Sequence, residues 1–207
     1  MFEFNDVADR YVLLPIVHGY KYVTPDPMEQ GVDNFFNNLD HISNTVNALF
    51  QLKFKDAGIY AGSFLANTTV GVFGVFDAAN AMGFPRLGGE DFGQTMGYYG
   101  VPSGPYIMLP IYGPSSMRDA PGRLVDGTYD YKDFVRPIRT RNQMYFLEGI
   151  STRSQLIEAE AFITGDRYSF IRQAYLQQRE YLVNDGVYDD EVEFDDFGGD
   201  WGEDDEY

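Results

Sequence analysis

The stretch that decides the fold is FGQTMGYYGVPSGPYIMLPIYGPSSMRD, Phe92 to Asp119. Glycine, proline and aromatic residues follow one another so densely from Gly83 to Pro114 that neither a regular helix nor a long strand is expected there. No charged side chain occurs from Phe92 to Met117. Irregular backbone is normally solvated, because its amide and carbonyl groups need hydrogen-bond partners. This segment must therefore fold into the core or rest against an apolar phase.

The segments upstream of this stretch are helical in pattern. Apolar residues recur at helical spacing from Met28 to Leu52, which predicts an amphipathic helix with a break near Asn37 and Asn38. The next segment, Ala57 to Phe76, carries no charge and is about as long as a membrane span. Its glycines and polar residues make it too polar for a lone span. We expect a buried helix, with a helix lying in the membrane among partner helices as the alternative.

Helical spacing returns downstream, after Pro137. Gly149 and Gly165 are expected weak points or caps of this region. A last helix is expected after Asp166, whose side chain suits an N-cap. The chain is thus predicted to be mostly α, without an internal repeat or an alternating strand pattern.

Composition limits the classes of protein to consider. The 207 residues are 44% hydrophobic, which is enough for one domain with a substantial core. The net charge of −17 argues against a nucleic-acid partner. Twelve acidic and no basic residues lie between Asp185 and Tyr207, so the rest of the chain is only mildly acidic. We expect one helical domain over residues 1–186 and a disordered acidic tail over residues 187–207. The tail either solubilises the protein or attracts a basic partner.

No catalytic or cofactor motif stands out. Cysteine is absent, which excludes disulfides and thiolate metal sites. Neither His18 nor His41 has a second ligand at helical spacing, so structural or surface roles are expected and no metal site or cofactor is predicted. Ser63 and Ser103 lack a nucleophile motif, and no glycine-rich phosphate loop occurs. Weak divalent cation binding is conceivable in the tail, at Asp189, Asp190 and Glu191. The uncharged aromatic segments suggest a protein that handles an apolar ligand without transforming it.

The central stretch resembles the signature of the MlaA/VacJ family, in which FG, YGV, GPY, LP, YGPS and RD recur in this order. FLANTTVGVFGVFDAA, Phe64 to Ala79, is similar to a second family block. LEGISTRSQL and YSFIRQAYLQQREYLVNDG resemble the C-terminal blocks, and the opening MFEFNDVADRYVLLP resembles the N-terminal helix of the family. The resemblance covers everything except the acidic tail.

The sequence departs from the family pattern in two places, at its N-terminus and after Gly71. Family members begin with a lipoprotein signal peptide and an acylated cysteine, and neither lies upstream of Met1. We therefore expect the sequence to be a truncated or processed form whose lipid anchor is inferred from the family. Family sequences also commonly have paired glycines where this chain has Val72, Phe73 and Gly74, which adds bulk at an expected packing position.

The resemblance implies a function and an architecture. The fold would be a single-domain helical ring, shaped like a doughnut, with an irregular hairpin region around a central amphipathic channel. The protein would not be an enzyme; it would remove mislocalised phospholipid from the outer leaflet of the Gram-negative outer membrane. It would act from the periplasmic side, bind a trimeric porin, and pass phospholipid to a soluble periplasmic carrier similar to MlaC, which preserves lipid asymmetry.

The same resemblance suggests the residues that handle lipid. The channel and its gating hairpin would lie between Gly83 and Tyr112, and the N-terminal helix would help set which leaflet has access. Ordinary packing is an equally good account of any one of these side chains. The candidate channel and gating residues are Phe2, Phe4, Asn5, Tyr98, Tyr99, Tyr106 and Met108.

Two other functions fit the same apolar surface. The first is a scaffold that only binds the porin, which would leave lipid asymmetry normal in its absence. The second is a membrane lipid hydrolase using Ser63 or Ser103, which would release fatty acid or lysolipid.

Overall fold

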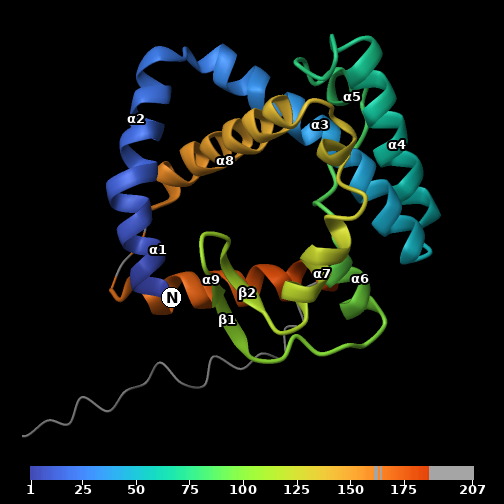
Figure 1. Ribbon diagram of the computed structural model, residues 1–207. Helices are drawn as coiled ribbons and strands as arrows, with labels where there is room; N and C mark the ends of the chain where they lie inside the picture. The colour runs from blue at the N-terminus through green and yellow to red at the C-terminus, as the bar shows by residue number, and fades with distance from the viewer. Residues whose placement is uncertain (161–162, 164, 187–207) are drawn as a thin grey trace, which may run out of the picture.

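The computed structural model describes residues 1–160, 163 and 165–186. Within them, helices follow one another around a closed ring, and a short β-hairpin reaches into its opening (Figure 1). The helices are α1 (Phe2–Ala8), a π-helical turn (Asp9–Leu13), α2 (Leu14–Val23), α3 (Asp26–Phe50), α4 (Phe54–Thr69), α5 (Ala78–Ala81), α6 (Phe92–Tyr98), α7 (Asp119–Asp126), a 3-10 turn (Tyr131–Phe134), α8 (Ile138–Glu160) and α9 (Arg167–Val183). The expected helical ring is confirmed.

In the described part of the chain, two short strands pair to form a β-hairpin. Strand β1 (Tyr106–Leu109) pairs antiparallel with β2 (Gly113–Ser116), with Tyr106 opposite Ser116 and Leu109 opposite Gly113. Gly113 adopts a φ of +78°, a backbone conformation that glycine reaches without a steric cost. The hairpin region was expected to end at Tyr112, but its second strand lies beyond that residue.

Three details of the predicted elements differ from the structure. The helix α3 runs without a break, because Asn38 is buried and its side-chain amide donates to Thr68 Oγ1 on α4 at 3.0 Å. The segment Phe92–Tyr98 is helical, since the Asp91 carboxylate accepts a hydrogen bond from the Gln94 amide and caps it. Helix α8 passes through Gly149 uninterrupted. The N-cap at Asp166 is confirmed, with the Ser169 amide donating to its carboxylate.

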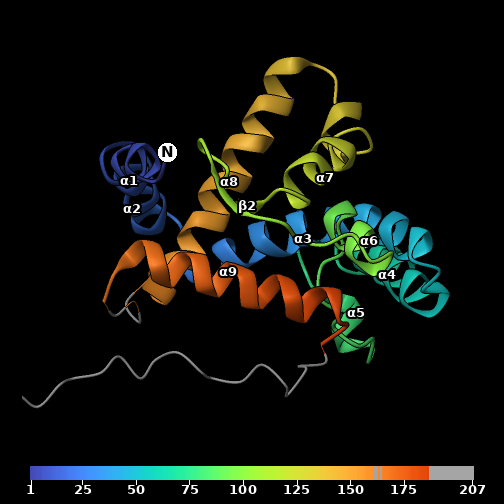
Figure 2. The same cartoon turned by 90° about the horizontal axis from the view of Figure 1, so that it is seen from below.

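The expected buried helix upstream of the signature is only half buried. Helix α4 buries one face, which includes Ala57 and Tyr60, and packs against α3. Its other face exposes Leu65 at 61%, and the turn that follows exposes Phe73 at 73%. The view from below shows α4 at the edge of the ring (Figure 2). No helix in the described part of the chain is long and apolar enough to cross a membrane.

The ring buries polar side chains and exposes apolar ones to a greater extent than an ordinary protein core does. Among the described residues, buried polar side chains outnumber buried apolar ones. The buried apolar residues are Val17, Phe36, Ala48, Ala57, Tyr60, Ala79 and Ile150. Many large apolar side chains are exposed instead, with Tyr22 at 92% and Phe54 at 68%. Exposure of so many large apolar side chains indicates contact with a membrane, a ligand or another protein.

Candidate functional site

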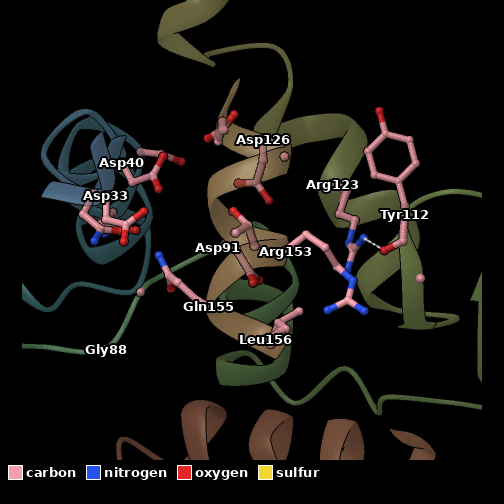
Figure 3. Close-up of a pocket in the computed structure, with 18 of the residues that line it drawn as sticks. Asp33, Asp40, Gly88, Asp91, Tyr112, Arg123, Asp126, Arg153, Gln155 and Leu156 are labelled. Atoms are coloured by element: carbon pink, nitrogen blue, oxygen red, sulfur yellow. Dashed lines mark hydrogen bonds between the residues drawn. The ribbon is translucent and has the colours of Figure 1, made fainter. Parts of the chain in front are cut away.

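A cavity of about 1990 Å³ occupies the centre of the ring. Helices α1, α3, α7, α8 and α9 and the hairpin turn all contribute to its lining. Figure 3 shows part of it, where Asp33, Asp40, Asp126, Arg123 and Arg153 lie around the same space. The ring therefore brings residues that are far apart in sequence to one cavity.

The lining is amphipathic. Helix α3 supplies a polar strip along its length, formed by Gln30, Asp33, Asn34, Asn37, Asp40, Ser43 and Asn44. The N-terminal helices, the hairpin and α8 supply apolar side chains, namely Phe2, Val12, Leu13, Met108, Ile111, Phe146 and Leu156. A ligand with both polar and apolar parts finds matching surfaces for each within this cavity.

Ion pairs close the ring where its first and last helices meet. The Arg153 guanidinium on α8 donates to both carboxylate oxygens of Asp9, at 2.7 and 2.8 Å, and also to Glu160. Hydrogen bonding to Asp9 is the main reason that the pKa of Arg153 is raised further, so its charge is permanent. Arg167 at the start of α9 donates to Asp6 at 2.5 Å. Pairs of this geometry, partly buried and bidentate, hold the N-terminal segment against α8 and α9.

A second charged cluster joins α3, α8 and the 3-10 turn. The buried Lys132 ammonium donates to both oxygens of Glu148, at 3.0 and 2.7 Å, and lies 3.3 Å from Asp130. Burial, with a further contribution from the negative charge of Glu148, raises the pKa of Asp40 to about 6. The nearby Lys132 charge opposes this shift without cancelling it. Asp40 is thus an acid of the cavity that changes charge at mildly acidic pH.

The end of the signature stretch anchors α7 beneath the cavity. The buried Arg118 and Asp119 form an ion pair at 2.8 Å, and Ser116 Oγ accepts from the Asp119 amide. Burial alone would raise the pKa of Asp119, but hydrogen bonds from Tyr175 and Arg118 dominate and lower it to about 2. Arg179 on α9 lies 2.9 Å from Asp119. The network fixes α7 to the hairpin and to α9.

Three of the predicted channel residues line the cavity. They are Phe2 and Asn5 on α1 and Met108 on β1. Asn5 contacts the hairpin directly: its side-chain amide donates to the Leu109 carbonyl at 2.8 Å, and its oxygen accepts from the Ile111 amide at 2.8 Å. Ile111 has a φ of +68°, which is strained for a β-branched residue, and its side chain is 78% exposed. Asn5 therefore helps to hold the hairpin turn in place through two hydrogen bonds.

The other four predicted residues lie away from the cavity lining. Phe4 is 55% exposed on α1, and Tyr98 and Tyr99 are 45% and 61% exposed at the end of α6. The Tyr99 hydroxyl donates to the Phe50 carbonyl at 2.6 Å. Tyr106 packs edge-on against two tyrosines of α9, with ring centroids 6.0 and 5.9 Å away. Tyr98 and Tyr99 face outward because α6, which was expected to be irregular, is a helix; any lipid contact of these four residues stays a prediction.

A sequence model of the family described as MlaA lipoprotein matches residues 1–182. The chain belongs to the MlaA lipoprotein family.

Relatives and a solved structure agree with this assignment. The chain is similar to the intermembrane phospholipid transport system lipoprotein MlaA of Escherichia coli (strain K12), at 33% identity over 90% of this chain and 76% of that protein. The protein of the same name from Haemophilus influenzae is also 33% identical, over the same shares. The fold also matches a solved structure described as the structural basis for maintenance of bacterial outer membrane lipid asymmetry. That structure superimposes on this chain with a TM-score of 0.77. It is 32% identical, and the match covers 88% of this chain and 94% of that one.

The last two residues of the MlaA signature take part in the network that fixes α7 to the hairpin and to α9. Arg118 and Asp119 are the RD pair that ends the signature, and both are buried. Sequence reasoning did not single them out as functional residues. The signal was present, since they are the first charges after a long uncharged run.

Where MlaA family sequences commonly have paired glycines, Val72 and Phe73 take up an unusual backbone conformation. Both residues adopt positive φ, +54° and +60°, a region that glycine favours. Their side chains are 55% and 73% exposed, so the added bulk does not meet the packed interface. Gly74 makes the close contact: a Cβ there would lie 2.7 Å from Asn38. The bulk that was expected at a packing position is therefore placed at exposed residues, and the glycine at the close contact is retained.

The remaining candidate chemistry of this MlaA family member is sparse. Ser63 is buried and lines the cavity, and the Ser103 hydroxyl is buried without a partner. Among the described residues, neither serine has a hydrogen bond to His18 or His41. No group of three potential metal ligands occurs in the described part of the chain. The acidic tail, residues 187–207, with its conceivable cation ligands, lies outside the described residues.

Proposed function

We propose that this protein takes phospholipid from the outer leaflet of the outer membrane and passes it to a soluble periplasmic carrier. The single observation that carries the proposal is the amphipathic cavity of about 1990 Å³ within a ring whose outer residues are apolar. This volume exceeds the roughly 300 to 1,000 Å³ of ordinary ligand pockets, as a ligand with two acyl chains requires. The kinship with MlaA lipoproteins of a phospholipid transport system supports the same substrate class.

The outer surface of the ring suits an apolar surrounding. Large apolar side chains outside the cavity lining are exposed on α2, α4 and the turn after α4, among them Tyr22, Phe54, Leu65 and Phe73. Irregular backbone at membrane depth is tolerated where it lines a cavity or is buried in protein, which describes the hairpin turn. The ring lies in the inner leaflet and presents its opening to the lipid phase.

The hairpin turn is the movable part of the cavity wall. The strain at Ile111 favours movement of the turn, and hydrogen bonds with Asn5 and from Arg123 oppose it. Release of Asn5 would let the turn move and change access to the cavity. Family resemblance implied that the hairpin and the N-terminal helix gate the channel. The contact between Asn5 and the hairpin turn is one that could control such a gate.

Anchoring and partners belong to the proposal as well. By kinship with lipoproteins, the protein carries a lipid anchor. The apolar side chains exposed on α2, α4 and the turn after α4 offer a surface for a trimeric porin. Transport needs no hydrolysis, because lipid can move along a series of sites of increasing affinity.

The proposal is tested by purifying the protein in detergent, extracting it with organic solvent, and identifying bound molecules by mass spectrometry. Intact phospholipid in the extract supports lipid conduction. The absence of phospholipid from folded protein that still binds porin favours the scaffold function instead. Release of fatty acid or lysolipid from vesicles of phosphatidylethanolamine would instead favour the hydrolase, and loss of that release in Ser63→Ala would assign it.

A further inference from the structure

One cationic side chain of the cavity differs from the others in its partners. The basic residues of the described lining are Arg86, Arg123, Lys132, Arg153, Arg167 and Arg179. All of them except Arg123 form an ion pair with at least one carboxylate. Their charges are thus compensated within the protein. Among the described residues, Arg123 makes hydrogen bonds to backbone carbonyls alone, to Pro114 at 3.1 Å and to Tyr112 at 3.3 Å, the second of which is drawn in Figure 3.

The two acids nearest to Arg123 on α7 are engaged elsewhere. Asp119, one turn before it, is taken up by Arg118, Arg179 and Tyr175. Asp126, three residues after it, accepts from the Phe92 amide and from the Asn47 and Tyr129 side chains. The helix that carries Arg123 therefore leaves its positive charge without a local counter-ion.

The guanidinium of Arg123 also retains unused donors. An arginine side chain offers five N–H groups, and the two recorded bonds use one from each terminal nitrogen. The side chain is exposed and lines the cavity beside the hairpin turn. A planar cation with free donors is well suited to binding a phosphate through two parallel hydrogen bonds.

We infer that Arg123 binds the phosphate of a phospholipid headgroup at the hairpin turn, as a specificity-determining residue of the cavity. This inference rests on the proposed function, since it assumes that phospholipid enters the cavity. The apolar Ile111 and Met108, which lie on the same hairpin and line the same cavity, contact the acyl chains of that lipid. Lipids without a phosphate, such as diacylglycerol, lose this contact.

The test measures binding of soluble short-chain lipids to the detergent-purified protein by calorimetry. The probes are dihexanoylphosphatidylcholine, dihexanoylglycerol, which lacks the phosphate, and inorganic phosphate alone. Arg123→Gln removes the charge but keeps an amide that can donate to the Pro114 carbonyl, and Arg123→Lys keeps the charge. Arg139→Gln is the matched control, because Arg139 is an exposed arginine of α8 outside the cavity lining.

We expect Arg123→Gln to bind the phosphatidylcholine probe about fivefold more weakly at low salt, as an exposed charge pair allows. The difference shrinks at high salt, and binding of dihexanoylglycerol is unchanged. Arg123→Lys keeps the charge but loses the planar fork, so it should bind the phosphatidylcholine probe with an affinity between those of the wild type and Arg123→Gln. Arg139→Gln should bind both lipids like the wild type, with an equal thermal unfolding midpoint. Such a salt-dependent loss confined to the phosphate-bearing probe would not follow from a merely structural change.

Two results overturn the inference, and they are distinguishable. If Arg123→Gln binds the phosphatidylcholine probe as tightly as the wild type does, Arg123 is not the phosphate contact, whereas the proposed lipid function stands. If the wild type binds inorganic phosphate through Arg123 but neither lipid, the site takes a free anion. That second outcome refutes the proposed lipid function together with the inference.

Discussion

The contact between Asn5 and the hairpin turn can be broken by a single substitution. Asn5→Ala removes both hydrogen bonds, from its amide to the Leu109 carbonyl and from the Ile111 amide to its oxygen, each 2.8 Å long. A typical net value of about 0.5–1.5 kcal/mol for each bond gives roughly 1–3 kcal/mol for the pair. The strained φ of Ile111, worth about 1–3 kcal/mol, then favours opening against the remaining hydrogen bonds from Arg123 to the turn. The turn should open about 5 to 150 times more often.

Amide hydrogen exchange followed by mass spectrometry measures this opening directly. Peptides covering residues 106–116 should exchange faster in Asn5→Ala, while peptides of α3 and α4 keep the wild-type rate. Asn5→Asp keeps the acceptor for the Ile111 amide but loses the donor, so it should fall between the two. Asn37→Ala is the control, because Asn37 also lines the cavity and no hydrogen bond links it to the hairpin. Equal exchange of the turn in wild type and Asn5→Ala would refute the reasoning.

Three further predictions concern stability and can be checked by unfolding experiments in detergent. The pKa of Asp40 is raised from 3.8 to about 6, so the folded state holds its proton more tightly than the unfolded state, and stability falls as pH rises through this window. Asp40→Asn should therefore stabilise by at most about 3 kcal/mol above pH 6 and by nothing near pH 4; an equal gain at both values contradicts this. Asp119 has the opposite shift, to about 2, so its contribution is present above pH 4 and lost as pH falls toward 2; Tyr175→Phe, which removes a 2.5 Å bond to Asp119, should lower stability at neutral pH by about 1–3 kcal/mol and flatten this acid limb. Gly74→Ala should cost about 1–3 kcal/mol more than Gly100→Ala, because both glycines have positive φ but only at Gly74 would a Cβ meet a neighbour; equal costs would show that the Asn38 contact yields.

The sequence predicted the elements of the ring better than their contacts. The spacing of apolar residues indicated α3 almost to its bounds, because a helix with one apolar face leaves a local periodic record. The uninterrupted course of α3 through Asn38 could not be predicted, since it depends on Thr68 of another helix. The closure of the ring by Arg153 and Asp9 joins residues 144 positions apart, and no local pattern records such a pair.

Only part of the candidate site could be predicted, because the site also depends on contacts between residues that are distant in sequence. Family resemblance pointed to Asn5 and Met108, which line the cavity. The same resemblance also pointed to Tyr98 and Tyr99, in a segment expected to be irregular, but the Asp91 cap starts a helix there and both tyrosines are exposed outside the cavity lining. Arg123 was not singled out from the sequence, because what distinguishes it is that it has no carboxylate partner among the described residues in three dimensions.

Transfer of labelled phospholipid through the cavity is the most direct measurement of the central claim. Donor vesicles with the embedded protein are mixed with a soluble periplasmic carrier, and label on the carrier is followed over time. Asn37→Trp places a large side chain in the cavity, whereas Lys55→Trp places the same side chain on the exposed surface outside it. The account predicts transfer by the wild type and Lys55→Trp, and strongly reduced transfer by Asn37→Trp. Equal transfer by both tryptophan variants, or none by the folded wild type, would contradict conduction through this cavity.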